Sequence, residues 1–248
     1  MKRWILAMAG CGLLWAGAAG AFEVGARVAY WIPQLSGDVR LDDGVKGDTV
    51  DFTDDLGVDD ENFFFGDAWL WIGDHHLILS ATRVDYSGTK TLSSPITFGG
   101  KTFSERTDTS LEYTQLDLAY RYDLIDLENI LAGFSLGPQL QVKYLDGEVR
   151  MEAAGQEESQ SFQIPIPMVG LGGHLGILAD LLEVRAHAVG MAYRGNRIVE
   201  ASGEVSYNPL PFIELVAGYR YFQIDVETDD LTLDYAQTGP YVGVGAKF

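Results

Sequence analysis

The stretch DFTDDLGVDDENFFF, residues 51–65, sets five aspartates and one glutamate beside three phenylalanines. Clustered carboxylates can ligate a divalent cation, act as an acid and base, or solvate a loop. A helix–loop–helix calcium loop needs glycine at its sixth position, but counting from Asp51 that position is Leu56. Two interpretations stay open: a solvated loop that enters an apolar layer at Phe63, or an irregular Ca²⁺ or Mg²⁺ site. The candidate ligands of such a site are Asp54, Asp55, Asp59, Asp60 and Glu61. The sequence indicates no other cofactor.

The first 21 residues have the three parts of a secretory signal peptide. Lys2 and Arg3 precede a short apolar run, and the small residues 19–21 form a cleavage site. We therefore expect residues 1–21 to be removed and residues 22–248 to form a single domain. The only cysteine, Cys11, lies in the signal, so the mature chain would hold neither a disulfide nor a thiolate metal site.

Charge and hydropathy exclude two further classes. The formal net charge is −19, and it falls to −21 when Lys2 and Arg3 are removed. Nucleic-acid affinity depends on Lys and Arg that neutralise phosphates, so nucleic acid is not an expected partner. The mature sequence contains no continuous apolar segment long enough for a transmembrane helix.

Apolar and polar residues alternate with a period of two through most of the mature chain, which predicts strands. Short turns alternate with long polar connections near 34–62, 87–110 and 147–161, which we expect to be extracellular loops. Hydrocarbon satisfies no backbone N–H or C=O group, so such strands must close on themselves. The predicted fold is all-β: a closed antiparallel transmembrane β-barrel of up-and-down topology with ten strands, or eight as the alternative. The ten strands are expected near 22–33, 63–73, 76–87, 110–124, 129–146, 162–178, 182–194, 197–209, 212–226 and 234–248.

The ending TGPYVGVGAKF alternates apolar residues with tyrosine, glycine and lysine and stops on phenylalanine. It resembles the C-terminal assembly signal of bacterial outer-membrane β-barrel proteins, in which Tyr241 and Phe248 would be the signal residues. The resemblance covers the signal peptide, the strand pattern and the last strand. It implies an integral protein of the Gram-negative outer membrane, with lipid, lipopolysaccharide and the barrel-assembly machinery as partners.

The polar faces of the predicted strands would form the lumen. Its acids and bases are nearly balanced, which favours a cross-linked interior over a selective pore with an excess of one sign. For the strands near 63–73 and 76–87, the faces are assigned by placing Asp67, Arg83 and Asp85 inside. The principal lumen candidates are Arg27, Asp117, Arg121, Lys143, His174, Arg185, His187, Glu204 and Arg220.

Some outer-membrane barrels that this chain resembles are enzymes, so their catalytic motifs can be looked for in this sequence. Surface proteases of ten strands use an Asp-x-His pair at the outer rim, whereas here Asp74 and His76 fall on a tight turn at the opposite end. Lipid A deacylases place a serine two residues after histidine, which neither His174 nor His187 matches. We therefore expect no enzyme. The functions left open are a small channel or envelope structural protein with acidic loops and, as the alternative, a closed barrel for surface binding or adhesion, with a hydrolase the least favoured.

One more feature bears on function: the segment TLSSPITFGGKTFSERT. Gly99 and Gly100 suit a two-residue hairpin turn, which requires positive φ. Phe98 and Phe103 beside that turn could contact a ligand, a partner or each other.

Overall fold

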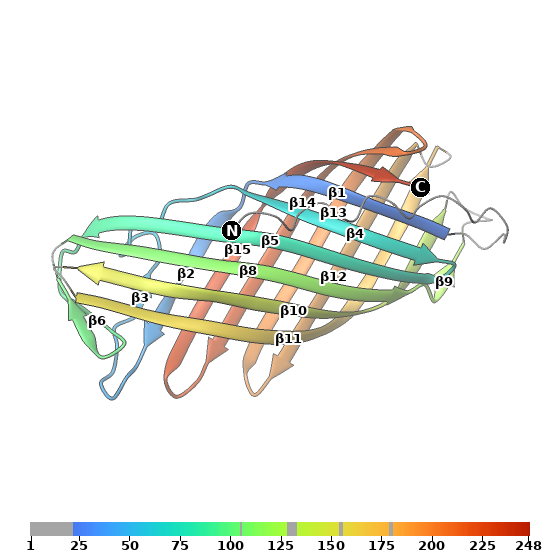
Figure 1. Ribbon diagram of the computed structural model, residues 1–248. Coiled ribbons are helices and arrows are strands. Elements are labelled where there is room, and N and C mark those ends of the chain that lie inside the picture. The colour runs from blue at the N-terminus through green and yellow to red at the C-terminus, as the bar shows by residue number, and fades with distance from the viewer. Residues whose placement is uncertain (1–21, 105, 128–132, 154–155, 179–180) are drawn as a thin grey trace, which may run out of the picture.

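The computed structural model describes residues 22–104, 106–127, 133–153, 156–178 and 181–248. The expected signal peptide, residues 1–21, lies outside them. Strands form the molecule (Figure 1), and among the described residues no helix is long and apolar enough to cross a bilayer. The strands are β1 (Phe22–Trp31), β2 (Gln34–Leu41), β3 (Val50–Asp51), β4 (Phe63–Ile72), β5 (His75–Thr91), β6 (Ile96–Phe98), β7 (Lys101–Phe103), β8 (Arg106–Tyr122), β9 (Ile125–Asp126), β10 (Phe134–Ala153), β11 (Gln156–Ile177), β12 (Leu182–Tyr193), β13 (Asn196–Leu210), β14 (Ile213–Glu227) and β15 (Leu231–Lys247).

The sheet closes into a barrel with ten strand positions. One of these positions is occupied by two consecutive strands, β1 and β2. Neighbours run in the order β1, β4, β5, β8, β10, β11, β12, β13, β14 and β15, and β15 returns to β1. β1 pairs with the C-terminal part of β15, and β2 continues the same wall by pairing with the N-terminal part. All of these pairings are antiparallel, so the predicted closed, up-and-down barrel of ten strands is confirmed.

The two ends of the barrel differ. The start of β1 and the end of the chain lie at one end, here called the turn end, where Val24 and Phe248 exchange backbone hydrogen bonds. The opposite end, the loop end, carries the long connections that the sequence predicts to be extracellular. Much of the expected loop sequence is in fact strand, because β2, β5, β8, β10 and β11 extend into the ranges 34–62, 87–110 and 147–161.

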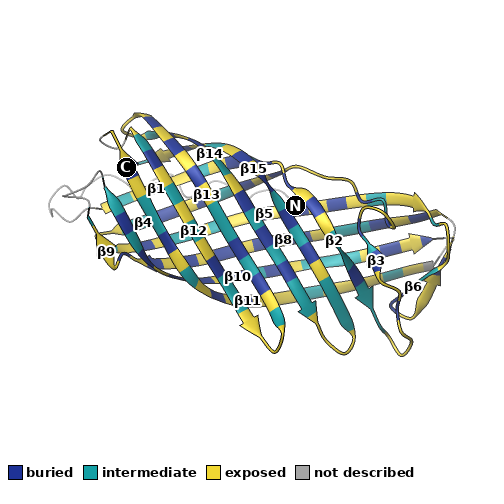
Figure 2. Ribbon diagram, turned by 180° about the vertical axis from the view of Figure 1, so that it is seen from behind, coloured by how far each residue is buried: buried dark blue, intermediate teal, exposed yellow. Residues whose placement is uncertain are grey.

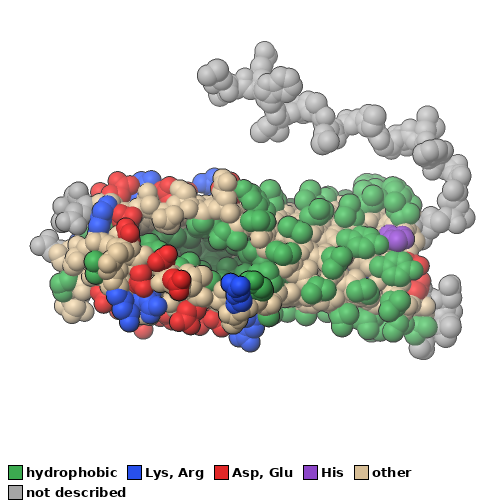
Figure 3. Space-filling view, turned by 90° about the horizontal axis from the view of Figure 1, so that it is seen from below, with side chains coloured by type: hydrophobic (Ala, Val, Ile, Leu, Met, Phe, Trp, Pro, Cys, Tyr) green, Lys and Arg blue, Asp and Glu red, His purple; other side chains and the backbone are tan. Residues whose placement is uncertain are grey.

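Buried and exposed residues alternate along the strands (Figure 2), but the polarity of the two faces inverts midway. On β10, Gln141 and Lys143 are buried while Leu140 and Val142 are exposed. Two residues beyond Lys143 toward the loop end, Leu145 is buried on the same face, and Asp146 is exposed. The turn-end half therefore has an apolar exterior and a charged interior, whereas the loop-end half resembles a soluble barrel. Figure 3 shows this division as a hydrophobic belt beside a surface that carries the charges.

The inversion corrects two sequence assignments. Arg83 and Asp85 were expected in the lumen, but both are exposed and their neighbours Val84 and Tyr86 are fully buried. Arg83 pairs with Glu112 on the outer surface at 3.1 Å. Period-two alternation identifies residues that share a face, but the medium outside the barrel decides which face is buried. Lipid surrounds the turn-end half and water the loop-end half.

The wall has a gap between β11 and β12. Their pairing runs only from Ile177–Leu182 to Val169–Gly190, although β11 continues to Gln156. Beyond Val169, toward the loop end, β11 pairs with β10 alone among the described strands. Pro165 and Pro167 lie in this part of β11. Proline has no N–H for a second neighbour, so it is found where a strand has a partner on one side only.

Two segments cap the loop end. The turn after β3 is built by Asp51, whose side chain accepts hydrogen bonds from the N–H groups of Thr53 and Asp54. It directs Phe52, Leu56 and Val58 into the barrel, where all three are buried.

The second cap is the β6–β7 hairpin, whose predicted glycine turn is confirmed by φ values of 56° at Gly99 and 73° at Gly100. Phe98 and Phe103 are both buried, and Lys101 pairs with Glu158 of β11 at 2.7 Å. The hairpin therefore packs on the barrel mouth.

Candidate functional site

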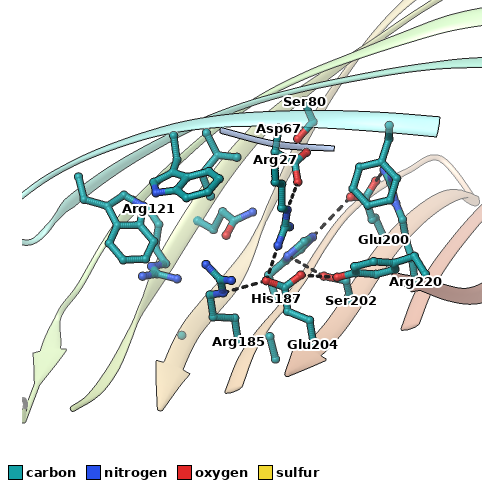
Figure 4. Close-up of a pocket in the computed structure, with 18 residues that line it drawn as sticks. Arg27, Asp67, Ser80, Arg121, Arg185, His187, Glu200, Ser202, Glu204 and Arg220 are labelled. Atoms are coloured by element: carbon teal, nitrogen blue, oxygen red, sulfur yellow. Dashed lines mark hydrogen bonds and ion pairs between the residues drawn. The ribbon is translucent and has the colours of Figure 1, made fainter. Parts of the chain in front are cut away.

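The centre of the turn-end half holds a network of two arginines and three acids, of which Figure 4 draws all but Glu214. Arg27 of β1 contacts Asp67 of β4 at 2.6 Å and Glu204 of β13 at 2.7 Å. Arg185 of β12 contacts the same Glu204 at 2.8 Å and Glu214 of β14 at 2.7 Å. Five strands from opposite sides of the barrel are thus joined across the lumen. Tyr241 of β15 adds a sixth, because its hydroxyl donates a hydrogen bond to Glu204.

A second network lies nearer the loop end and centres on Lys143, which is completely buried. Its Nζ is 2.7 Å from Asp117 and 2.7 Å from Glu200. Arg220 contacts the same two carboxylates at 3.6 Å and 3.3 Å. His187 lies 3.4 Å from Glu200 and bonds Ser202 at 3.0 Å.

A third group occupies the turn end. His76 and Arg121 each lie 2.8 Å from the carboxylate of Asp123, and the Ser135 hydroxyl bonds His174 at 2.8 Å. His76 was not among the lumen candidates, because Asp74 and the histidines were interpreted as a hydrated turn. The sequence feature that could have identified His76 as a lumen residue is its even spacing from Ser80, which puts both on the same face of the strand.

These contacts fill the turn-end lumen. Among the residues that the structure describes, six basic residues face eight acids there: Arg27, Arg121, Lys143, Arg185, Arg220 and Lys247 against Glu23, Asp67, Asp117, Asp123, Glu183, Glu200, Glu204 and Glu214. The free space left among them is a polar cavity of about 120 Å³. Desolvated charges are tolerated only when they are paired, so each carboxylate fixes the position of a cation.

Aromatic side chains cover the charged lumen on its loop-end side. The Arg220 guanidinium lies over the rings of Trp31 and Phe65, at 5.2 Å and 5.7 Å, and Lys143 lies 4.8 Å from the ring centroid of Phe222. These cation–π contacts place a hydrophobic surface directly over the charges.

A layer of hydroxyl and amide groups comes next. The Tyr113 hydroxyl lies 2.9 Å from that of Tyr235 and 3.0 Å from Gln237, which donates to Tyr86 at 3.0 Å. The polar groups of this layer satisfy one another.

The loop-end half encloses an apolar cavity of about 190 Å³ above this layer. Its lining comes from six barrel strands, the turn after β3 and the β6–β7 hairpin. The lining residues are Val39, Leu41, Phe52, Phe98, Leu111, Tyr113, Leu145, Val149, Gln160, Phe162, Ile164, Phe222, Ile224, Leu231, Leu233 and Tyr235. Of the residues singled out from the sequence, Phe98 falls here. None of the lumen candidates does, because the lining residues lie in the loop-end half, where the apolar face is the inner one.

The structure places all nine lumen candidates on the inside. It divides them among the three groups: Arg27, Arg185 and Glu204 in the first, Asp117, Lys143, His187 and Arg220 in the second, and Arg121 and His174 in the third. Of the two assembly-signal residues, Phe248 is exposed at the barrel end and Tyr241 points into the lumen.

The acidic candidates Asp54, Asp55, Asp59, Asp60 and Glu61 are not gathered. No three metal-ligating side chains in the described part of the chain come close enough to hold an ion. Asp55 instead accepts from the N–H of Asp51, and Asp60 accepts from that of Leu35. A Ca²⁺ or Mg²⁺ site in this segment stays a prediction.

Comparison with known proteins agrees with the fold. No protein-family model and no curated protein matches the sequence. Among solved structures, the outer-membrane protease OmpT of Escherichia coli is similar at a TM-score of 0.60 and 10% identity, over 92% of this chain and 98% of that chain. Ail of Yersinia pestis gives 0.37 at 14% identity, over 92% and 99% of the two chains, and neisserial surface protein A gives 0.34 at 16%, over 93% and 100%. The fold is thus that of integral outer-membrane β-barrels of Gram-negative bacteria.

Proposed function

We propose that this protein is a non-conducting outer-membrane barrel whose loop-end half is a binding module exposed on the cell surface. The observation that carries the proposal is the charged lumen: ion pairs join opposite walls at two levels, and aromatic rings cover them. Barrels of about eight strands are filled by their side chains, and those of about sixteen enclose a channel, so ten strands are close to the filled limit.

The loop-end half supports the binding part of the proposal. A barrel that only anchored itself in the membrane would not need strands that extend well beyond the hydrophobic belt (Figure 3). Here the extended strands build a second interior with its own cavity and its own cap.

A narrow channel is the second candidate, and the polar cavity of about 120 Å³ between the networks favours it. Passage would require several ion pairs to separate together. Each break leaves a buried charge unpaired, at about 3–5 kcal/mol.

Hydrolysis, as named for the OmpT structure, has less support. Asp74 and His76 lie at the turn end, where His76 is buried and bound to Asp123. Ser135, whose hydroxyl contacts His174, is completely buried.

The test is electrical. Residues 22–248 are refolded, checked for a heat-modifiable band and inserted into a planar bilayer. We expect no discrete conductance steps, because the lumen is cross-linked. Reproducible steps from the folded protein would overturn the non-conducting assignment and favour the channel.

A further inference from the structure

We propose that the apolar cavity of the loop-end half binds a small, uncharged, apolar molecule about the size of one aromatic ring. The ligand would enter through the gap between β11 and β12. This inference deepens the proposed binding function by naming the site, the ligand class and the entry path.

The lining defines the chemistry of the ligand. Aliphatic and aromatic side chains provide nearly the whole cavity surface, and the rings of Tyr113 and Tyr235 face it while their hydroxyls bond each other and Gln237. A ligand carrying a charge or several hydrogen-bonding groups would lose its hydration without compensation. An apolar ligand has no such penalty and removes its own surface from water.

The volume limits the ligand's size. A cavity of about 150 Å³ lined by Leu, Ile and Phe stays dry and binds benzene. The cavity here has about 190 Å³ and a similar lining, so one ring with a small substituent fits.

The entry path follows from the strand pairing. Ile164 points into the cavity, opposite Leu145 of β10, and yet is 45% exposed. It lies in the part of β11 that has no partner on the β12 side among the described strands. Figure 3 shows a hollow with hydrophobic side chains in the charged half of the surface. The cavity is therefore open at the side while the hairpin and the β3 turn cover it at the mouth.

The layer of hydroxyl and amide groups beneath the cavity blocks passage from this site into the charged lumen. Tyr113, Tyr235 and Gln237 close the cavity on the lumen side, and the Lys143 network lies beyond them. A ligand that enters from the side is held there and is not passed toward the turn end.

The test uses fluorobenzene as the probe and residues 22–248 refolded in phosphatidylcholine nanodiscs, because detergent would compete for the cavity. Binding is followed by ¹⁹F NMR and corrected with empty nanodiscs. Ile164→Trp places a large ring in the cavity. Its matched control, Gln163→Trp, places the same ring on the outer face, where Gln163 contacts Asp146.

We expect saturable binding by the wild type, at least about tenfold weaker binding by Ile164→Trp, and a change within about twofold for Gln163→Trp. If Ile164→Trp gives no heat-modifiable band and so does not fold, Val149→Phe replaces it as the variant that fills the cavity, from β10. The proposal is overturned if binding is absent or if the filled variants bind as the wild type does. Equal loss in Gln163→Trp, or a co-purified acyl chain that excludes fluorobenzene, would also overturn it.

The two proposals fail in distinguishable ways. Conductance steps with fluorobenzene binding intact would remove the non-conducting assignment and leave the cavity site. A bilayer without conductance steps, together with no fluorobenzene binding, would leave the non-conducting assignment and remove the cavity site.

Discussion

Val169 of β11 pairs with Gly190 of β12, and this is the last pairing between the two strands toward the loop end. Below this pair the wall is continuous. Above it, β11 runs beside the cavity with no partner on the β12 side among the strands that the structure describes. Pro167 and Pro165 lie two and four residues beyond the pair, and β12 itself ends at Tyr193, three residues after Gly190. The prolines withhold N–H groups where the last residues of β12 could still pair.

Restoring the missing N–H groups should narrow this gap. In the variant Pro165→Val/Pro167→Val, we expect β12 to pair further along β11, because both strands then carry complete donors and acceptors. Hydrogen exchange of Ala192 and Tyr193 should slow, and fluorobenzene should leave the cavity more slowly. Pro138→Val, on the outer face of β10, is the control. Unchanged exchange at Ala192 would show that the prolines do not limit the pairing.

The lumen networks predict a stability difference. Lys143→Met leaves Asp117 and Glu200 with one cation fewer, and we expect it to lower the free energy of unfolding by about 3–5 kcal/mol. Arg83→Met, which breaks the exposed pair with Glu112, should cost less than about 1 kcal/mol. Urea unfolding in lipid vesicles, followed by tryptophan fluorescence, compares the two. Equal effects would mean that the Lys143 network contributes no more than a surface pair.

A row of like charges predicts a pH effect at the loop end. Asp38 lies opposite Asp234 of β15 and Asp51 of β3, and partial burial together with these two carboxylates raises the pKa of Asp38 above its ordinary value of 3.8. Since the folded state holds the proton more tightly, stability should rise as pH falls through the raised pKa toward 3.8, and should gain nothing further below that value.

Asp38→Asn tests this directly. At neutral pH the variant should be more stable by a few tenths to about 1 kcal/mol, because directly opposed like charges destabilise a sheet. The advantage should disappear at a pH below 3.8, where Asp38 itself is protonated. Hydrogen exchange of β2 amides, corrected for intrinsic rates, measures the effect, with the exposed Asp59→Asn as control. An advantage that is equal at both pH values would contradict the assignment.

The hairpin cap predicts a protease effect. Gly100 has φ of 73°, and a Cβ added there would lie 2.9 Å from the carbonyl oxygen of Asp43. We expect Gly100→Ala to cost about 1–2 kcal/mol locally and to loosen the hairpin. Trypsin should then cut faster at Lys101, which the wild type holds against Glu158.

Gly203→Ala is the matched control for this change, because a Cβ there meets nothing within 4 Å. If Gly100→Ala and the wild type are cut at the same rate, the hairpin is not held by this turn.

The sequence by itself determined the class of fold and the membrane-embedded lumen. Alternation over 115–124 correctly placed Asp117 and Arg121 inside, because lipid outside leaves only the interior for charged side chains. It also identified the glycine turn of the hairpin, since that turn needs positive φ at two successive residues.

Only the tertiary structure decided the rest. Above the belt, water replaces lipid as the outer medium, the same alternation turns its apolar face inward, and Arg83 lies outside while Val84 is buried. The cavity depends on residues from strands far apart in the chain, such as Leu111 and Leu233. Its entry depends on where β12 stops pairing with β11. Period and composition report which residues share a face, but closure of the barrel decides what that face encloses.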